Sequence, residues 1–195
     1  ILNLTLDSCY CMYDMLSTIL ATYKYENNDM TLNYEKIHML KLLDECFSKS
    51  YKDMRHKNIR IKVQAKDKFV SLYADKNQMK KAFENLINYC VSNAYEDTEI
   101  VCEIGKHNDE NNVFISLGFE SPYVSSETIQ NMFRMYTTSA EKMDKVGSSL
   151  SLYLAKQIIN AHNGKINVES KKSNYNNYSI EIPCINECKL SAIAC

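Results

Sequence analysis

The sequence lacks a strong charge of either sign, because 23 lysines and arginines nearly balance 24 aspartates and glutamates in 195 residues. A net charge of −1 does not indicate a broad electrostatic surface for nucleic acid or an acidic membrane. The chain also lacks any apolar run near the roughly 18–20 residues that a membrane span needs. We therefore expect a cytoplasmic protein without a nucleic-acid partner, attached to a membrane only through a segment upstream of this sequence.

The amino-terminal end lacks the features of a secretory leader. Ile1 opens within a periodic helical pattern, and no basic stretch comes before it. Because the sequence does not start with methionine, we expect it to be a fragment of a longer protein. A sensor region or a membrane anchor is expected upstream of Ile1.

Eight cysteines occur without any Cys-x-x-Cys pair and without a histidine at zinc-finger spacing. Several fall at apolar positions of predicted helices or strands, where a free thiol behaves as a small hydrophobic group. We expect buried or incidental reduced thiols in the cytosol, and a redox or metal-binding role is the alternative. The cysteines are Cys9, Cys11, Cys46, Cys90, Cys102, Cys184, Cys188 and Cys195.

Residues 1–25 form one predicted helix with a narrow apolar stripe. Its members recur at alternating spacings of four and three, which is the a/d seam of a coiled coil or a four-helix bundle. The seam consists of Leu2, Leu6, Cys9, Tyr13, Leu16, Leu20 and Tyr23, and it is widened by Thr5, Met12 and Ile19. This pattern favours a homodimer through the N-terminal helix. The alternative is a helix that packs on its own domain.

The rest of the chain alternates between helical and strand patterns. Expected helices cover 34–54, 75–94, 126–136 and 148–161, and expected strands cover 59–65, 69–73, 99–106, 113–119, 165–170 and 178–183. Asp75 is the predicted N-cap of its helix, and Asn163-Gly164 is the predicted left-handed end of the last one. This order predicts an α+β fold, a two-layer α/β sandwich with a mixed sheet and helices on one face, preceded by the N-terminal dimerisation helix.

Residues 146–170, VGSSLSLYLAKQIINAHNGKINVES, are similar to the second glycine box of sensor histidine kinases and to the helix and strand that follow it. Residues 75–93 and 126–139 resemble the N box and the phenylalanine box of that family. Residues 59–183 together resemble its catalytic ATP-binding domain, the GHKL or Bergerat fold, and residues 1–56 resemble the second half of the dimerisation hairpin with its linker.

The resemblance implies a division of the chain and a set of partners. We expect the last helix of a histidine-phosphotransfer hairpin in 1–30, an ATPase-like catalytic domain in 31–185 and a tail in 186–195. ATP and Mg²⁺ are the implied cofactors of this two-component signalling family. The implied partners are a second copy of the chain and a response regulator or partner kinase.

The N box departs from the family pattern. Asn85 stands at its first position, Tyr89 at the metal-binding asparagine and Ser92 at the basic residue. These three share a helix face by their i, i+4, i+7 spacing. A hard cation prefers small oxygen ligands to a bulky neutral ring. Using Asn88 instead would turn its side chain about 100° away from the site.

The first glycine box departs further. Phe119 stands at the aspartate that accepts the adenine amino group, while Ser121 and Tyr123 stand at glycines. A phenylalanine cannot accept that hydrogen bond, and an unpaired buried amino group costs about 1–3 kcal/mol. Tyr123 is expected to occupy space where the base or sugar should lie. The alternative register makes Glu120 the adenine acceptor, but it misplaces Pro122.

The second glycine box keeps Gly147 and the packing residue Leu150, whereas Ser149 and Ser151 replace two of its three usual glycines. Backbone N–H groups and the helix dipole still attract an anion weakly. Serine, however, penalises the positive φ and the close approach that glycine allows.

No catalytic or metal-ligating residue is predicted. In the lid expected at 137–146, Lys142 and Lys145 are candidates for phosphate contact, and solvated loop lysines are the alternative. The phospho-acceptor histidine of the family would precede Ile1. None of the histidines present is followed by an acidic residue on the dimer stripe: His38, His56, His107 and His162.

The lost metal ligand, adenine acceptor and close-approach glycines all fall on one pocket. The core positions around this pocket, in contrast, keep the residues that a folded core needs. The sequence therefore predicts a histidine kinase module with a degenerate nucleotide pocket, acting through dimerisation and protein contacts. The main alternative is an active autokinase with unusual ATP contacts, which phosphorylates an upstream histidine and passes phosphate to a response regulator. A third reading is a scaffolding domain of the same fold outside two-component signalling.

Overall fold

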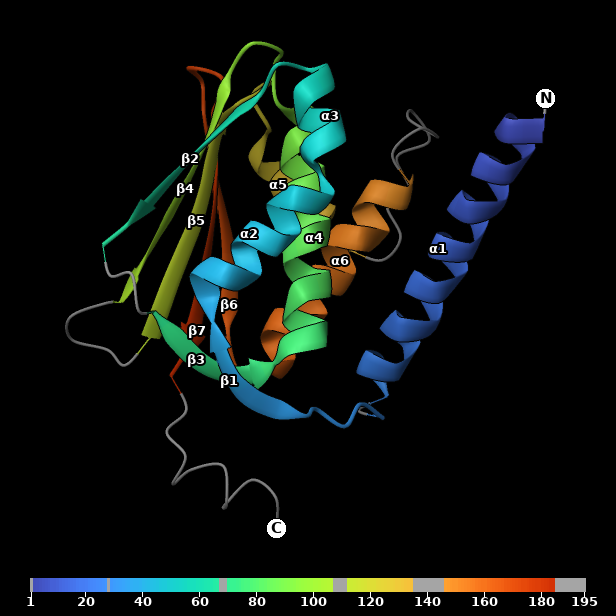
Figure 1. The fold of residues 1–195 in the computed structure, drawn as a ribbon, viewed down its shortest axis with the longest axis vertical. Helices are drawn as coiled ribbons and strands as arrows, with labels where there is room; N and C mark the ends of the chain where they lie inside the picture. Colours follow the sequence, from blue (N-terminus) through green and yellow to red (C-terminus); the bar gives the residue numbers. More distant parts are fainter. Residues whose placement is uncertain (1, 28, 67–69, 107–111, 135–145, 185–195) are drawn as a thin grey trace.

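A computed structural model describes residues 2–27, 29–66, 70–106, 112–134 and 146–184 of the chain. Two layers make up the main body, a sheet on one side and helices on the other, and a long N-terminal helix stands beside the helical layer (Figure 1). The α+β sandwich expected from the sequence is confirmed. Within the described residues, no helix is both long enough and apolar enough to cross a membrane.

The main sheet is mixed, with the order β2-β4-β5-β7-β6. Strand β2 runs parallel to β4, and all the other neighbours are antiparallel. A separate two-stranded sheet pairs β1 with β3. The strands are β1 Tyr34–His38, β2 Arg60–Ala65, β3 Ser71–Asp75, β4 Glu99–Lys106, β5 Asn112–Glu120, β6 Lys165–Lys171 and β7 Tyr175–Pro183.

The helical layer covers one face of the main sheet (Figure 1). Helix α4 lies in its middle and packs against both α2 and α6, and the N-terminal helix α1 packs against α6. Apolar side chains of the helices and of alternate strand residues form one continuous core. The helices are α1 Leu2–Glu26, α2 Met39–Lys49, α3 Tyr51–His56, α4 Lys76–Asn93, α5 Ser126–Met132 and α6 Val146–Ala161.

The helix expected over 34–54 is wrong in two places. Its first five residues form strand β1, in which only Ile37 is buried, opposite Leu72 of β3. The helical part then breaks at Ser50, which separates α2 from α3. The Ser50 hydroxyl donates to Asn88 Oδ1 on α4 at 2.6 Å, so a tertiary contact holds this break. Helical spacing of apolar residues alone does not reveal either change.

The amino end of α4 and the carboxyl end of α6 are joined by a buried histidine. Asp75 caps α4 as predicted, because its side chain accepts from the Gln78 N–H at 3.0 Å. His162 Nε2 accepts from the Asp75 N–H at 3.0 Å, and its Nδ1 bonds the Ile158 carbonyl at 2.8 Å. A ring that accepts at Nε2 and donates from Nδ1 is neutral. Burial lowers the pKa of His162, in agreement with that state.

Acid should destabilise the protein partly through this histidine. In the unfolded chain His162 binds a proton below about pH 6.5, whereas in the folded chain it does so only below its lowered pKa. The free energy of unfolding therefore decreases as the pH falls from about 6.5 through that lowered pKa. The variant His162→Gln should lose stability at pH 7 but show a flatter dependence between pH 7 and 5 in urea unfolding. The exposed His56→Gln is the control and should keep the parent's slope. Parallel curves for His162→Gln and the parent would contradict the assignment.

The N-terminal helix contacts the domain mainly through its last turns. Thr22 and Tyr25 are buried there. The Tyr25 hydroxyl donates to Gln78 Oε1 on α4 at 2.9 Å, and the Tyr153 hydroxyl of α6 donates to Glu26 Oε1 at 2.8 Å. The earlier turns of α1 extend alongside the helical layer (Figure 1). The helix is thus anchored to the sandwich at one end, where Tyr25 joins the core cluster, and its exposed earlier residues lie outside that core.

Candidate functional site

The residues predicted from the glycine and N boxes lie on α4, at the end of β5 with the loop that follows it, and at the start of α6. Asn85 and Tyr89 are half-buried on α4, and Ser92 on the same helix is exposed. Asn85 Nδ2 donates to the Ser151 carbonyl at 3.2 Å, which ties α4 to α6. The amide at the first N-box position is therefore engaged in a contact between the helices.

An aromatic cluster of Tyr89, Phe119 and Tyr178 fills the space between α4 and the sheet. The rings of Phe119 and Tyr178 stack with centroids 5.8 Å apart, and the ring of Tyr89 is tilted against Tyr178 at 5.6 Å. Phe119 and Tyr178 are each only 1% exposed. Tyr178 pairs with Leu117 in the β5–β7 register, so its ring lies on the helical face of the sheet.

The cluster carries hydroxyl groups but no charge. Burial raises the pKa of both Tyr89 and Tyr178, so both phenols stay protonated at neutral pH. The Tyr178 hydroxyl lies 3.9 Å from the sulfur of Met132 on α5. Sequence reasoning singled out Tyr89 and Phe119 but missed Tyr178. The strand pattern at 178–183 was the available signal, since it places residue 178 on the inward face.

The loop after β5 is held by a buried amide from β7. Asn176, which is opposite Phe119 in the register, donates from Nδ2 to the Ser121 hydroxyl and to the Pro122 carbonyl, the latter at 3.0 Å. Its Oδ1 is buried and has no hydrogen-bond partner among the described residues. Tyr123, expected over the base or sugar, is 45% exposed. Asn176 was not identified from the sequence, because it lies between the expected strands 165–170 and 178–183.

The second glycine box lies in the first turns of α6. This helix begins at Val146, two residues before the expected start, so Gly147 and Ser149 belong to it. The structure describes only the backbone at these two positions. Leu150 is buried, and Ser151 offers its carbonyl to Asn85. The lid lysines Lys142 and Lys145 lie outside the described residues, as does the tail at 186–195.

Comparison with known proteins places this arrangement in a family. Residues 74–185 match the family described as histidine kinase-, DNA gyrase B-, and HSP90-like ATPase. Sporulation kinase E of Bacillus subtilis (strain 168) is 21% identical over 168 residues, which are 86% of this chain and 22% of that protein. The chain spans less than half the length of the curated relatives it matches, from 22% to 47%.

Solved structures share the fold. Histidine kinase AdeS of Acinetobacter baumannii superposes with a TM-score of 0.75 at 14% identity, over 93% of this chain and 82% of that one. Histidine kinase ThkA, solved in complex with response regulator protein TrrA, gives 0.74 at 19% identity, over 94% of this chain and 50% of that one. The chain therefore belongs to the histidine kinase-, DNA gyrase B- and HSP90-like ATPase family and carries the catalytic-domain fold of a sensor histidine kinase.

Proposed function

We propose that this chain is the kinase-core module of a two-component sensor whose nucleotide pocket is degenerate, and that it works in the cytoplasm through dimerisation and protein contacts. The observation that carries the proposal is the aromatic cluster of Tyr89, Phe119 and Tyr178. In this cluster, Tyr89 stands where the family resemblance puts the metal-binding asparagine, and Phe119 stands where it puts the aspartate that binds adenine. A phenol at the first position and a buried phenyl ring at the second supply neither the amide oxygen for the metal nor the carboxylate for adenine.

The side chains at these positions do not fit Mg²⁺-ATP. Mg²⁺ takes oxygen ligands, usually carboxylates and phosphates, in strict octahedral geometry. Tyr89 offers only a protonated phenol, and the side chain of Asn85 is held against α6 by the bond from its Nδ2 to the Ser151 carbonyl. Phe119 offers no acceptor to an adenine amino group. We therefore propose that ATP binding is weak or absent and that any anion affinity left at Gly147–Ser151 is independent of Mg²⁺.

One observation favours the active autokinase as a second candidate. Asn176 Oδ1 is a buried acceptor without a partner in the part of the chain that the structure describes, and Asn176 lies across the register from Phe119. An orphaned acceptor of this kind costs free energy unless something donates to it. An adenine amino group would satisfy it. This candidate and the degenerate pocket differ in one measurable quantity, the affinity for Mg²⁺-ATP.

Calorimetric titration with ATP tests the proposal. Losing the adenine acceptor and the metal ligand costs about 1–3 kcal/mol each by the unpaired-group estimate, which moves a micromolar site to roughly millimolar. We expect no Mg²⁺-dependent ATP binding with a dissociation constant below about 100 μM. The same titration with EDTA in place of Mg²⁺ is the control. A tighter, Mg²⁺-dependent isotherm would establish the active autokinase instead.

We propose that a second copy of the chain covers the apolar stripe of α1. Its described members are all exposed, with Leu16 61% and Leu20 64% accessible. A row of large apolar side chains on one face of a helix is typical of an interface. The exposed members are Thr5, Leu6, Cys9, Met12, Tyr13, Leu16, Ile19, Leu20 and Tyr23.

Sedimentation of the chain and of Leu16→Asp tests the dimer. Each copy buries its Leu16 side chain in the proposed interface, at about 1.5–3 kcal/mol apiece. The substitution should weaken self-association by at least about a hundredfold. Lys24→Asp, an exposed change off the stripe, is the control and should leave it unchanged. A parent that stays monomeric at high concentration would contradict the proposal.

We also propose a response regulator or a partner kinase as the protein that this dimer contacts. The complex of ThkA with TrrA supports the first choice, because a chain of the same fold binds a response regulator there.

A further inference from the structure

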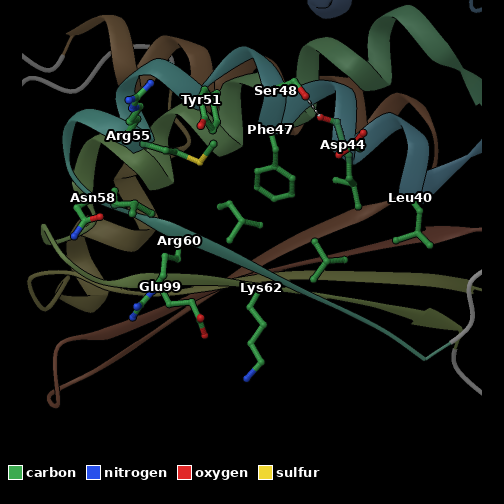
Figure 2. Close-up of a pocket in the computed structure, with 15 residues that line it drawn as sticks. Leu40, Asp44, Phe47, Ser48, Tyr51, Arg55, Asn58, Arg60, Lys62 and Glu99 are labelled. Carbon is green, nitrogen blue, oxygen red and sulfur yellow. Dashed lines mark hydrogen bonds between the residues drawn. The ribbon is translucent and has the colours of Figure 1, made fainter.

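A groove lies between helices α2–α3 and strand β2, which we call the β2 groove. Its volume is about 890 Å³, within the size range of small-ligand and peptide sites. Leu40, Phe47 and Ile61 line it, and Figure 2 shows Phe47 pointing from α2 toward the sheet. At its rim Val63 and Tyr51 are 47% and 62% exposed. The groove therefore offers apolar surface that the described part of the chain leaves uncovered.

One wall of the groove is an open sheet edge. Among the described strands β2 pairs with β4 alone and ends the sheet order. The Arg60 N–H donates to Thr98 and the Lys66 N–H to Ile104, both on the β4 side. In a parallel ladder alternate residues bond the same neighbour, so the backbone groups of Ile61, Val63 and Ala65 point outward. An exposed row of N–H and C=O groups is a template for another strand.

The positive charge on β2 determines which kind of strand can pair with it. Arg60, Lys62 and Lys66 are exposed, and no acidic residue lies within the strand. The carboxylates opposite in the register are Glu99, across from Arg60, and Glu103, across from Gln64, so three basic side chains still outnumber two acidic ones. In an antiparallel pair of two β2 strands centred on Val63, Arg60 would face Lys66. A pair centred on Lys62 would put two lysines together. Like charges directly opposite are destabilising, so a second copy of the chain is a poor occupant.

We propose that the β2 groove binds an extended, acidic segment of a partner protein, which adds to the sheet as a strand beside β2. Its backbone would pair with the outward groups of Ile61, Val63 and Ala65. Alternate apolar side chains would enter the groove beside Phe47, and the acidic ones would lie on the other face, where Lys62 points (Figure 2). The site is separate from the nucleotide pocket, because β2 is an edge strand and β4 lies between it and the strands β5 and β7 that carry Phe119 and Tyr178.

A synthetic probe tests the proposal on the full 195-residue chain. The probe is a capped heptapeptide in which glutamate alternates with valine and leucine. Titration followed by amide NMR should give saturable binding, with new protection from exchange at Ile61 and Val63. A peptide with lysine in place of glutamate should bind about tenfold more weakly at low salt.

Two variants separate strand addition from simple pocket filling. Val63→Pro removes an outward N–H and keeps the bonds of its neighbours to β4, so peptide binding should fall at least about tenfold. Lys62→Glu should weaken binding about threefold. Because Lys62 is exposed, this change should leave the fold intact, and it provides the test if the proline variant does not fold. Lys165→Glu on the opposite edge strand is the control and should have no effect.

Three results would overturn the proposal. The first is the absence of saturable binding of the acidic peptide up to about 1 mM, the limit of weak specific recognition. The second is equal binding of the lysine peptide. The third is binding that leaves the Ile61 and Val63 amides unprotected, since the ligand would then fill the groove without joining the sheet.

Discussion

Replacing Phe119 with aspartate and Tyr89 with asparagine in the same chain is expected to raise the affinity for Mg²⁺-ATP by at least about tenfold. The double change supplies the two oxygen ligands that the family pattern requires and removes two rings from the buried cluster. Tyr178 then loses both of its aromatic neighbours. Calorimetry with and without Mg²⁺ measures the gain.

The control for this variant changes the same two positions without adding an oxygen acceptor. Phe119→Leu with Tyr89→Phe shortens one side chain, removes one hydroxyl and should leave ATP binding unchanged. Both double variants should lose stability, by about 3 kcal/mol or more where a carboxylate replaces the buried Phe119 ring. Far-ultraviolet circular dichroism must therefore show that each is folded at the titration temperature.

The result of these titrations distinguishes two structural explanations for weak ATP binding. A gain restricted to the aspartate–asparagine variant means that the pocket differs from an ATP site chiefly at these side chains. No gain in a folded variant means that the serines at Ser149 and Ser151 have also closed the approach to phosphate. A gain in both double variants would contradict the role given to the oxygen ligands.

Much of the fold could be predicted because its signals are local. The side chain of Asp75 caps α4, and alternation marks the first halves of β4 and β5, where the buried residues recur with period two before β5 becomes buried on both faces. Strand β1 has no such signal. It buries only Ile37 and exists because its backbone pairs with β3. The break at Ser50 depends on Asn88, 38 residues away, and no local pattern contains that contact.

The site was predictable only in part for a related reason. Family spacing picked out Asn85, Tyr89 and Phe119, which occupy adjacent elements in the structure. The residues that complete it, Tyr178 and Asn176, come from β7 and meet the others through strand register. A long-range pairing of this kind decides which side chains share a pocket, and the sequence alone does not specify it.

Replacing Gly164 with alanine is expected to be among the most destabilising single changes in the chain. Gly164 follows Asn163, whose φ of 57° ends α6, and its N–H donates to the Ile159 carbonyl at 2.9 Å. An added Cβ would lie 2.8 Å from the Glu181 carbonyl oxygen and 2.9 Å from Ile159 Cγ2. Backbone oxygen on a central strand cannot move aside cheaply, so the cost should be about 3 kcal/mol.

Gly118→Ala provides the comparison, because its added Cβ also meets a neighbour, but a mobile one. The atom in its way is the hydroxyl end of Tyr175, a half-buried side chain that can swing outward. We expect a loss of no more than about half that of Gly164→Ala, although Gly118 is buried in the middle of the sheet. Thermal unfolding resolves the difference, since each kcal/mol shifts Tm by roughly 2–4 °C in a chain of this size. Equal losses would mean that the volume of the added methyl group, and not the rigidity of what it strikes, sets the cost at both positions.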